Sequence, residues 1–253
     1  MKNIFYQLAA AITFFTRLPI WKLVEIPGEY FKKIICFWPL TGWITGAFTA
    51  LSWWAFSIYF PPTLSIILAF ACRVLFTGGL HEDGLGDFFD GFGGGRTKED
   101  VLRIMKDSHV GSYALVGMIF YYALLISIVS TLPAEITFAA ILSADPFSKM
   151  ITALMMNLLP YARTEQESKV KTLFDKLSPS RIVTLLVFGL LPMLVLLEVK
   201  LWLAIILPMF TVTFVYYLAK KRIGGYTGDI CGATALLCEL SFYLSFYIAL
   251  TKL

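Results

Sequence analysis

Three aspartates in the segment HEDGLGDFFDGFGGGR, residues 81–96, have the spacing of a shared binding site. If this segment is helical, Asp83, Asp87 and Asp90 lie at positions i, i+4 and i+7 and face one side of the helix. Three like charges on one face repel one another, and a divalent cation that prefers oxygen ligands, Mg²⁺ or Mn²⁺, relieves that repulsion. The alternative is a solvated acidic face. Such faces normally alternate acidic and basic residues, whereas the nearest basic residue here is Arg96, so the spacing favours a metal site.

Glycines are frequent in and around the acidic segment. Inside a helix each glycine costs roughly 1 kcal/mol relative to alanine. The glycines therefore predict sharp turns, or a backbone that lies close to a ligand. For the last three, a flexible loop is an equally good interpretation. The positions are Gly78, Gly79, Gly84, Gly86, Gly91, Gly93, Gly94 and Gly95.

Basic residues follow the acidic segment. Arg96 precedes a short amphipathic helix predicted over residues 98–106, whose apolar side chains we expect to face the membrane. Arg96, Arg103 and Lys106 have the charge and the donors needed to bind phosphate oxygens.

The motif KDSHVG, residues 106–111, returns the chain to the bilayer edge at Asp107 and Ser108. His81 and His109 flank this part of the sequence. We interpret both as surface residues, with proton transfer as the alternative.

The composition predicts the elements that must position these residues. Hydrophobic residues make up 58% of the chain, charged residues 15%, and the mean hydropathy is +0.75, which indicates an all-α integral membrane protein. Residues 4–18 form either an eighth span or an interfacial helix, and without a small-residue cleavage site we expect them not to be a removed signal peptide. We expect one domain over residues 1–253. About seven spans are predicted, at residues 34–60, 63–80, 112–131, 134–159, 182–198, 200–219 and 230–250.

The basic residues predict the orientation of the chain. The segments 21–33, 81–111, 160–181 and 220–229 carry 3, 4, 5 and 3 Lys and Arg residues, together 15 of the 21. The alternate connections carry two, Lys200 and Lys252. Because Lys and Arg are retained on the cytoplasmic side, the active-site segment, about residues 81–111, is expected to face the cytoplasm. The net charge of +4 then reflects this bias and attraction to the lipid bilayer, and predicts no nucleic-acid partner.

Charged residues also occur inside predicted spans, where they are costly and usually functional. Arg73 precedes the acidic segment in its own span. Asp145 and Lys149 are four residues apart, so they form either a simple ion pair or part of a site. Asp229 ends the motif GGYTGD, residues 224–229, and is either a site residue or a helix N-cap.

Carboxylates that hold a divalent cation, nearby cationic residues and a position at the membrane surface together suit substitution at a diphosphate. The cation and the basic residues neutralise phosphate charge, and a further carboxylate takes a proton from an attacking hydroxyl. The residues alone do not specify the alcohol or the diphosphate.

Six motifs extend the prediction, because in this order they resemble the cobalamin synthase family, adenosylcobinamide-GDP ribazoletransferase. They cover the chain nearly end to end, and the central one is specific. The motifs are FFTRLP at 14–19, FWPLTGWITGA at 37–47, GGLHEDGLGDFFDGFGGG at 78–95, IMKDSHVGSYA at 104–114, LPYAR at 159–163 and GGYTGDICGA at 224–233.

The resemblance implies an enzyme of the bacterial or archaeal inner membrane, with its active site facing the cytoplasm. It would join adenosylcobinamide-GDP to α-ribazole, or to α-ribazole 5′-phosphate, and form adenosylcobalamin, or its 5′-phosphate, and GMP. The resemblance implies Mg²⁺ as cofactor, with Mn²⁺ as a substitute, and leaves the formation of oligomers open.

The resemblance also implies roles for individual residues. Glu82, Asp83, Asp87 and Asp90 would hold the metal, and one carboxylate would be the base for the ribazole 5′-hydroxyl. Asp107 would be catalytic and would complete the site together with Asp229. The residues implied to bind phosphate or substrate are Arg73, Arg96, Lys106, Ser108, Arg163 and Asp229.

The chain departs from the family pattern at three places. Lys149 stands where arginine is expected, Thr227 often corresponds to asparagine, and TEQES at 164–168 replaces a glycine-containing continuation. None of these departures touches the acidic segment. Trp38 and its neighbouring tryptophans are candidates for either a corrin surface or an interfacial belt.

Three other classes of membrane protein share some of these features. CDP-alcohol phosphotransferases also space aspartates along a helix, but the AR pair that follows DG in their motif is absent here. Membrane prenyltransferases have two Asp-rich motifs, and residues 224–229 supply only one Asp for the second. A transporter would use Arg73, Asp145 and Lys149 along its path, but would leave the glycine-rich motif unexplained.

Overall fold

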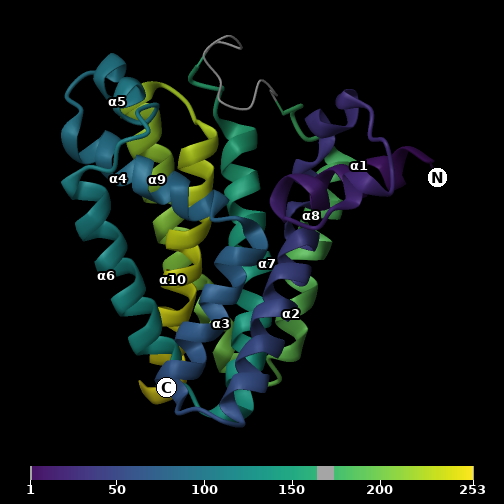
Figure 1. Ribbon diagram of the computed structural model, residues 1–253, viewed down its shortest axis with the longest axis vertical. Coiled ribbons are helices and arrows are strands. Elements are labelled where there is room, and N and C mark those ends of the chain that lie inside the picture. Colours follow the sequence, from purple (N-terminus) through teal and green to yellow (C-terminus); the bar gives the residue numbers. More distant parts are fainter. Residues whose placement is uncertain (1, 164–173, 253) are drawn as a thin grey trace.

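A computed structural model describes residues 2–163 and 174–252, and confirms the prediction of an all-α bundle (Figure 1). Within this part of the chain the only β-type pairing joins Tyr161 and Tyr226. Short 3-10 helices connect the longer ones, at Ile20–Lys22, Gly28–Lys33, Ile35–Phe37, Leu191–Val195 and Val199–Ile205. The α-helices are α1 Lys2–Phe15, α2 Trp38–Ser57, α3 Pro62–Thr77, α4 Leu80–Gly94, α5 Lys98–Ile104, α6 Ser112–Val129, α7 Ala134–Leu158, α8 Pro179–Leu190, α9 Ile206–Ile223 and α10 Gly228–Lys252.

Among the residues that the structure describes, four helices are long and apolar enough to cross a membrane, and the bent pair α3 and α4 makes five at most. The four are Ser112–Val129, Ala134–Leu158, Lys200–Ile223 and Gly228–Lys252. The predicted count of about seven is not confirmed. Helix α2 has 20 residues, but its Thr, Gly, Ser and Trp residues lower its hydropathy, and α8 has only 12 residues.

Helices α7 and α10 form the centre of the bundle. Their apolar windows are 78% and 72% buried, whereas the windows of α6 and of the span that contains α9 are 22% and 28% buried. The exposed apolar side chains of α6 and α9 therefore suit contact with lipid, and the polar side chains of α7 and α10 are enclosed by protein.

The turn between α3 and α4 sets the direction of the acidic segment. Gly78 and Gly79 have φ values of 78° and 71°, in the left-handed region that glycine adopts without strain. The two helix axes are bent by 95°, so α4 lies across the bundle near the end that also holds α5 (Figure 1). The sharp turn predicted at this glycine pair is confirmed.

A sharp turn is ruled out at Gly84, Gly86, Gly91, Gly93 and Gly94, because all five lie within α4. Close packing explains two of them. A Cβ atom at Gly84 would lie 2.7 Å from the backbone oxygen of Asp229, and one at Gly91 would collide with Met105. Glycine therefore lets α4 lie directly against α10 and α5, and this packing offsets the low helix propensity.

Two shorter helices lie near the α4 end of the bundle. Helix α1 has 14 residues, about 21 Å at 1.5 Å per residue, so it is too short to span and favours the interfacial alternative. Helix α5 confirms the predicted short helix. Val101 of this helix and Met105, directly after it, are buried against α4, however, and do not face the membrane as expected.

Candidate active site

The aspartates of α4 lie on one helical face, as their spacing predicts, but in different surroundings. Asp83 is exposed, whereas Asp87 and Asp90 are half-buried. Asp90 accepts hydrogen bonds from the backbone N–H groups of Gly111 at 2.7 Å and Ala114 at 2.8 Å. Its carboxylate therefore stabilises the first turn of α6 and fixes that helix against α4.

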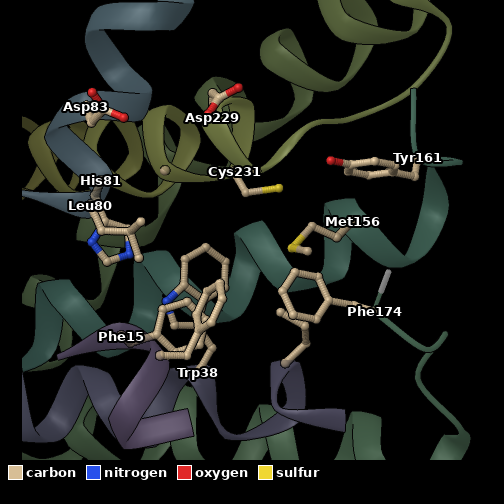
Figure 2. Close-up of a pocket in the computed structure, with 14 residues that line it drawn as sticks. Phe15, Trp38, Leu80, His81, Asp83, Met156, Tyr161, Phe174, Asp229 and Cys231 are labelled. Carbon is tan, nitrogen blue, oxygen red and sulfur yellow. The ribbon is translucent and has the colours of Figure 1, made fainter. Parts of the chain in front are cut away.

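Asp83 and Asp229 both line a pocket of about 180 Å³, called the aromatic pocket here because Phe15, Trp38 and His81 form much of its wall. The close approach of Gly84 to the backbone of Asp229 brings the two helices that carry the aspartates together. Figure 2 shows both carboxylates at one side of the pocket, away from the rings of Phe15 and Trp38. The pocket thus combines an apolar interior with an acidic edge.

Arg163 is brought to Asp229 by pairing of two motifs that lie far apart in the sequence. Tyr226 N–H donates to the Pro160 carbonyl and the Tyr226 carbonyl accepts from Ala162 N–H, both at 2.9 Å. Glycine at position 225 permits this approach, because a Cβ there would overlap the Pro160 carbonyl. The bridge places Arg163 Nη1 at 3.3 Å from Asp229 Oδ2, with the arginine side chain only 3% exposed.

The N-cap interpretation of Asp229 is wrong. Helix α10 begins at Gly228, so Thr227 precedes it, and the Thr227 hydroxyl accepts a hydrogen bond from Ile230 N–H at 3.3 Å. Asp229 lies within the first turn, where its carboxylate pairs with Arg163 and accepts a 3.5 Å hydrogen bond from the Thr227 hydroxyl. Thr227 stands where the family often has asparagine. Its hydroxyl oxygen still accepts a hydrogen bond at the start of α10, as an asparagine oxygen would.

Arg73 lies inside the bundle. Its Nη1 is 2.6 Å from Glu239 Oε1, and the two side chains are 5% and 3% exposed. The structure therefore places Arg73 against Glu239 and not with the aspartates of α4. Sequence reasoning missed Glu239, although a single glutamate in the apolar span 230–250 was a signal, since a charge at such a position needs a partner.

A second buried ion pair lies beside the first. Lys149 Nζ is 2.6 Å from Asp145 Oδ1, and Thr45 hydrogen-bonds both groups, which confirms the i, i+4 pair. A small polar cavity is shared by the two pairs, and the buried side chains of His81 and Glu82 also line it. The interpretation of His81 as a surface residue is therefore wrong. Glu82 lies apart from the carboxylate face of α4, because it occupies a different side of the helix.

The remaining predicted phosphate-binding residues are exposed in and near α5: Arg96, Lys106 and Ser108, with Asp107 beside them. Within the described residues, none of these four lines the aromatic pocket. The prediction about TEQES at 164–168 lies outside the described residues.

Asp107 and His109 form a local contact at this surface. His109 Nδ1 is 2.6 Å from Asp107 Oδ1, and His109 N–H also donates to that oxygen, at 3.0 Å. The hydrogen bond from the histidine lowers the pKa of Asp107, and the hydrogen bond to the carboxylate raises the pKa of His109. Asp107 and His109 are both exposed. The prediction of a surface histidine is therefore confirmed for His109 alone.

We expect the His109 imidazole to titrate above about 6.5, its ordinary value. Because the pKa of His109 is raised, its contact with Asp107 fully stabilises this segment below about pH 6.5, the ordinary pKa of histidine. This stabilisation is lost as the pH rises through the pKa of folded His109. The lowered pKa of Asp107 means that the contact is also lost as the pH falls through the pKa of folded Asp107. Histidine NMR of the labelled protein in nanodiscs measures this, with Asp107→Asn as comparison. An unchanged His109 pKa in that variant would contradict the assignment.

The residues present suit a metal that arrives with a phosphate ligand. Among residues 2–163 and 174–252, no three His, Cys, Asp or Glu side chains come together closely enough to hold a metal ion. Asp83, which is exposed, and Asp87, which is half-buried, lie one helical turn apart on α4 and supply two carboxylate side chains. Mg²⁺ is commonly bound by one or two carboxylates, with substrate phosphates and water completing its shell, so this pair fits the group that the sequence predicts.

The fold and the site define a multi-pass membrane protein whose carboxylates and basic residues gather at one end of a helix bundle. The chain belongs to the cobalamin-5-phosphate synthase family, whose model matches residues 7–247. Adenosylcobinamide-GDP ribazoletransferase from Shewanella sp. strain W3-18-1 is 34% identical over 238 residues, 92% of this chain and 90% of that protein. The protein of the same name from Shewanella oneidensis is 33% identical over 237 residues, again 92% and 90%. No solved structure matches the chain. The family resemblance of the six motifs is thus confirmed.

Proposed function

We propose that this chain joins adenosylcobinamide-GDP to α-ribazole, or to α-ribazole 5′-phosphate, and releases GMP. The family match over residues 7–247 carries this proposal, because it covers nearly the whole chain and its curated relatives are named for this transfer. The acidic edge of the aromatic pocket supports it, since a diphosphate requires both cationic groups and a metal-binding surface.

The bonds that change follow from the substrates and products. A ribose hydroxyl oxygen attacks the phosphorus that carries cobinamide, and the bond from that phosphorus to the bridging oxygen breaks. GMP leaves with the bridging oxygen and its electron pair, and the hydroxyl proton passes to a carboxylate. Because the 5′-phosphate of the acceptor is retained in the product, the attacking group is not the 5′-hydroxyl that the sequence-based hypothesis names.

The surroundings of the acidic residues support different roles for them. Asp83 and Asp87 would hold Mg²⁺, or Mn²⁺ in its place, and the bound ion would neutralise charge on the diphosphate. Glu82 and Asp90 are left out of this smaller set, because Glu82 lines the buried cavity and Asp90 caps α6.

Asp229 is our candidate for the proton acceptor. It borders the aromatic pocket, and Arg163 holds one of its oxygens in place at 3.3 Å. The same arginine would share the charge of a phosphate bound beside Asp229, which is the role that the sequence predicts for it. Arg96, Lys106, Asp107 and Ser108 stay candidates for contacts with the parts of the donor that extend beyond the pocket.

The purified protein in liposomes tests the reaction. With both substrates and Mg²⁺, we expect cobalamin, or its 5′-phosphate, and GMP in equal amounts by mass spectrometry, and no GMP when the acceptor is omitted. GMP release at the same rate without acceptor would identify a hydrolase and overturn the proposal.

We also propose that this site faces the cytoplasm from the inner membrane. The four basic segments support this orientation, and Figure 1 places α5 and the start of α10 at one end of the bundle and the C-terminus at the other.

A single labelling experiment tests the orientation. We expect Ser108→Cys to react with a membrane-impermeant maleimide in inverted membrane vesicles and to be protected in right-side-out vesicles. The native cysteines give a low background, because three of the four are buried and Cys72 is half-buried. Preferential labelling in right-side-out vesicles would reverse the proposed orientation.

A further inference from the structure

Three flat rings line one wall of the aromatic pocket in nearly parallel planes. The Phe15 and Trp38 centroids are 5.2 Å apart with an interplanar angle of 12°, and the Trp38 and His81 centroids are 5.8 Å apart with an angle of 11°. The rings come from α1, α2 and α4, so three separate elements are needed to form this wall. Met156 and Phe174 lie on the other side of the pocket (Figure 2).

The size and the chemistry of this pocket select among the parts of the two substrates. A volume of about 180 Å³ is too small for the corrin ring. Guanine carries several hydrogen-bond donors and acceptors along its edge, and burying them against an apolar wall is costly. The benzimidazole base of ribazole is flat and mostly apolar, with one ring nitrogen that accepts a hydrogen bond.

Trp38 carries a buried donor at this wall, without a partner among the described residues. Its side chain lines the pocket at 2% exposure, and its indole N–H has no hydrogen-bond partner in the described part of the chain. Buried indole N–H groups usually have an acceptor. The burial of Trp38 also excludes it from an interfacial belt in contact with lipid.

We propose that the aromatic pocket binds the planar base of the ribazole acceptor, with Trp38 as its principal contact. This inference rests on the proposed function and adds a subsite to it. A base held against Phe15 and Trp38 would direct its ribose towards Asp83 and Asp229, where the diphosphate reacts. The pocket therefore determines which acceptors are used.

Calorimetric titration of the detergent-purified protein with α-ribazole, without the diphosphate donor, tests the subsite. We expect Trp38→Leu to raise the Kd for α-ribazole about 10- to 100-fold, the range produced by loss of one base-stacking side chain. Trp38→Phe retains a ring and loses the N–H, so its Kd should lie between those of wild type and Trp38→Leu. Trp54→Leu is the matched control on the same helix, because Trp54 is 58% exposed, and should leave the Kd unchanged.

A second position keeps the test decisive if Trp38→Leu fails to fold. Phe15→Leu removes another ring from a different helix and should also weaken α-ribazole binding, while the Kd for GMP stays that of wild type. Unchanged α-ribazole binding in folded Phe15→Leu and Trp38→Phe would overturn the proposal. Weaker binding of GMP but not of α-ribazole would instead assign the pocket to guanine, and would overturn it as well.

Activity separates this inference from the proposed reaction. If wild type releases GMP normally and the pocket variants keep the wild-type KM for α-ribazole, the subsite is wrong and the reaction stands. If α-ribazole binding depends on Trp38 but wild type forms no cobalamin, the subsite stands and the proposed reaction is wrong.

Discussion

Asp229→Asn is expected to lower kcat for GMP release by about 10²- to 10⁴-fold, the usual contribution of a positioned general base. Asparagine keeps the size of the side chain and a contact for Arg163, but removes the proton acceptor. Because the base acts in the chemical step, KM for α-ribazole should change much less than kcat. Steady-state assays at saturating Mg²⁺ measure both constants.

The control for this prediction is Arg163→Lys, which retains a charge near Asp229 but loses the planar guanidinium that contacts it at 3.3 Å. We expect a smaller loss of kcat in this variant than in Asp229→Asn. If Asp229→Asn instead raised KM and left kcat intact, Asp229 would bind substrate and another carboxylate would take the proton.

Arg73→Met is expected to lower the stability of the protein by about 3–5 kcal/mol, the usual cost of removing one partner of a buried ion pair. Glu239 would then be left in the bundle interior, at 3% side-chain exposure, with a 3.2 Å hydrogen bond from the Tyr243 hydroxyl and no cationic partner at the Arg73 position. Thermal unfolding in detergent, compared with wild type, measures the effect.

The double variant Arg73→Met, Glu239→Leu shows how much of the loss comes from leaving Glu239 without a partner and how much from losing the ion pair itself. Because replacement of both members by apolar residues avoids an unpaired charge, it should recover most of the stability lost in the single variant. Arg103→Met is the matched surface control. Its side chain and that of its partner Asp100 are 72% and 41% exposed, so loss of this pair should change the stability far less than loss of the buried pair. Equal losses in Arg73→Met and Arg103→Met would contradict the account of the buried pair.

Local spacing predicted the parts of the site that depend on a single helix. The i, i+4 and i+7 pattern placed Asp83, Asp87 and Asp90 on one face, and the same rule paired Asp145 with Lys149. It could not show that Asp90 would cap α6, because its partners, Gly111 and Ala114, come from another part of the chain.

Most features that could not be predicted from the sequence depend on contacts between segments that lie far apart in the chain. Helix α4 tolerates its glycines because α5 and α10 pack against it, and the sequence shows their low helix propensity but not that packing. Arg163 reaches Asp229 through a backbone bridge of two hydrogen bonds, whose donors and acceptors occur in every non-proline residue. Arg73 was assigned to phosphate because its partner on α10 lies 166 residues away.

The number of membrane spans was also hard to predict from the sequence, because it depends on how the helices pack against one another. Hydropathy reports how well a helix faces lipid, but α2 packs against α7 through small residues, with Gly42 against the backbone of Pro146. Such a helix is long enough to cross a bilayer without being strongly apolar.

The dependence of GMP release on Mg²⁺ in wild type, Asp83→Asn and Asp100→Asn tests most directly whether the carboxylate face of α4 binds the reacting diphosphate. Asp100→Asn removes an acid from the exposed surface of α5, outside the proposed site. We predict saturable, acceptor-dependent release in wild type and in Asp100→Asn, and at least a tenfold higher Mg²⁺ requirement, or no release, in Asp83→Asn. The same Mg²⁺ dependence in all three proteins would show that the metal and the diphosphate bind elsewhere.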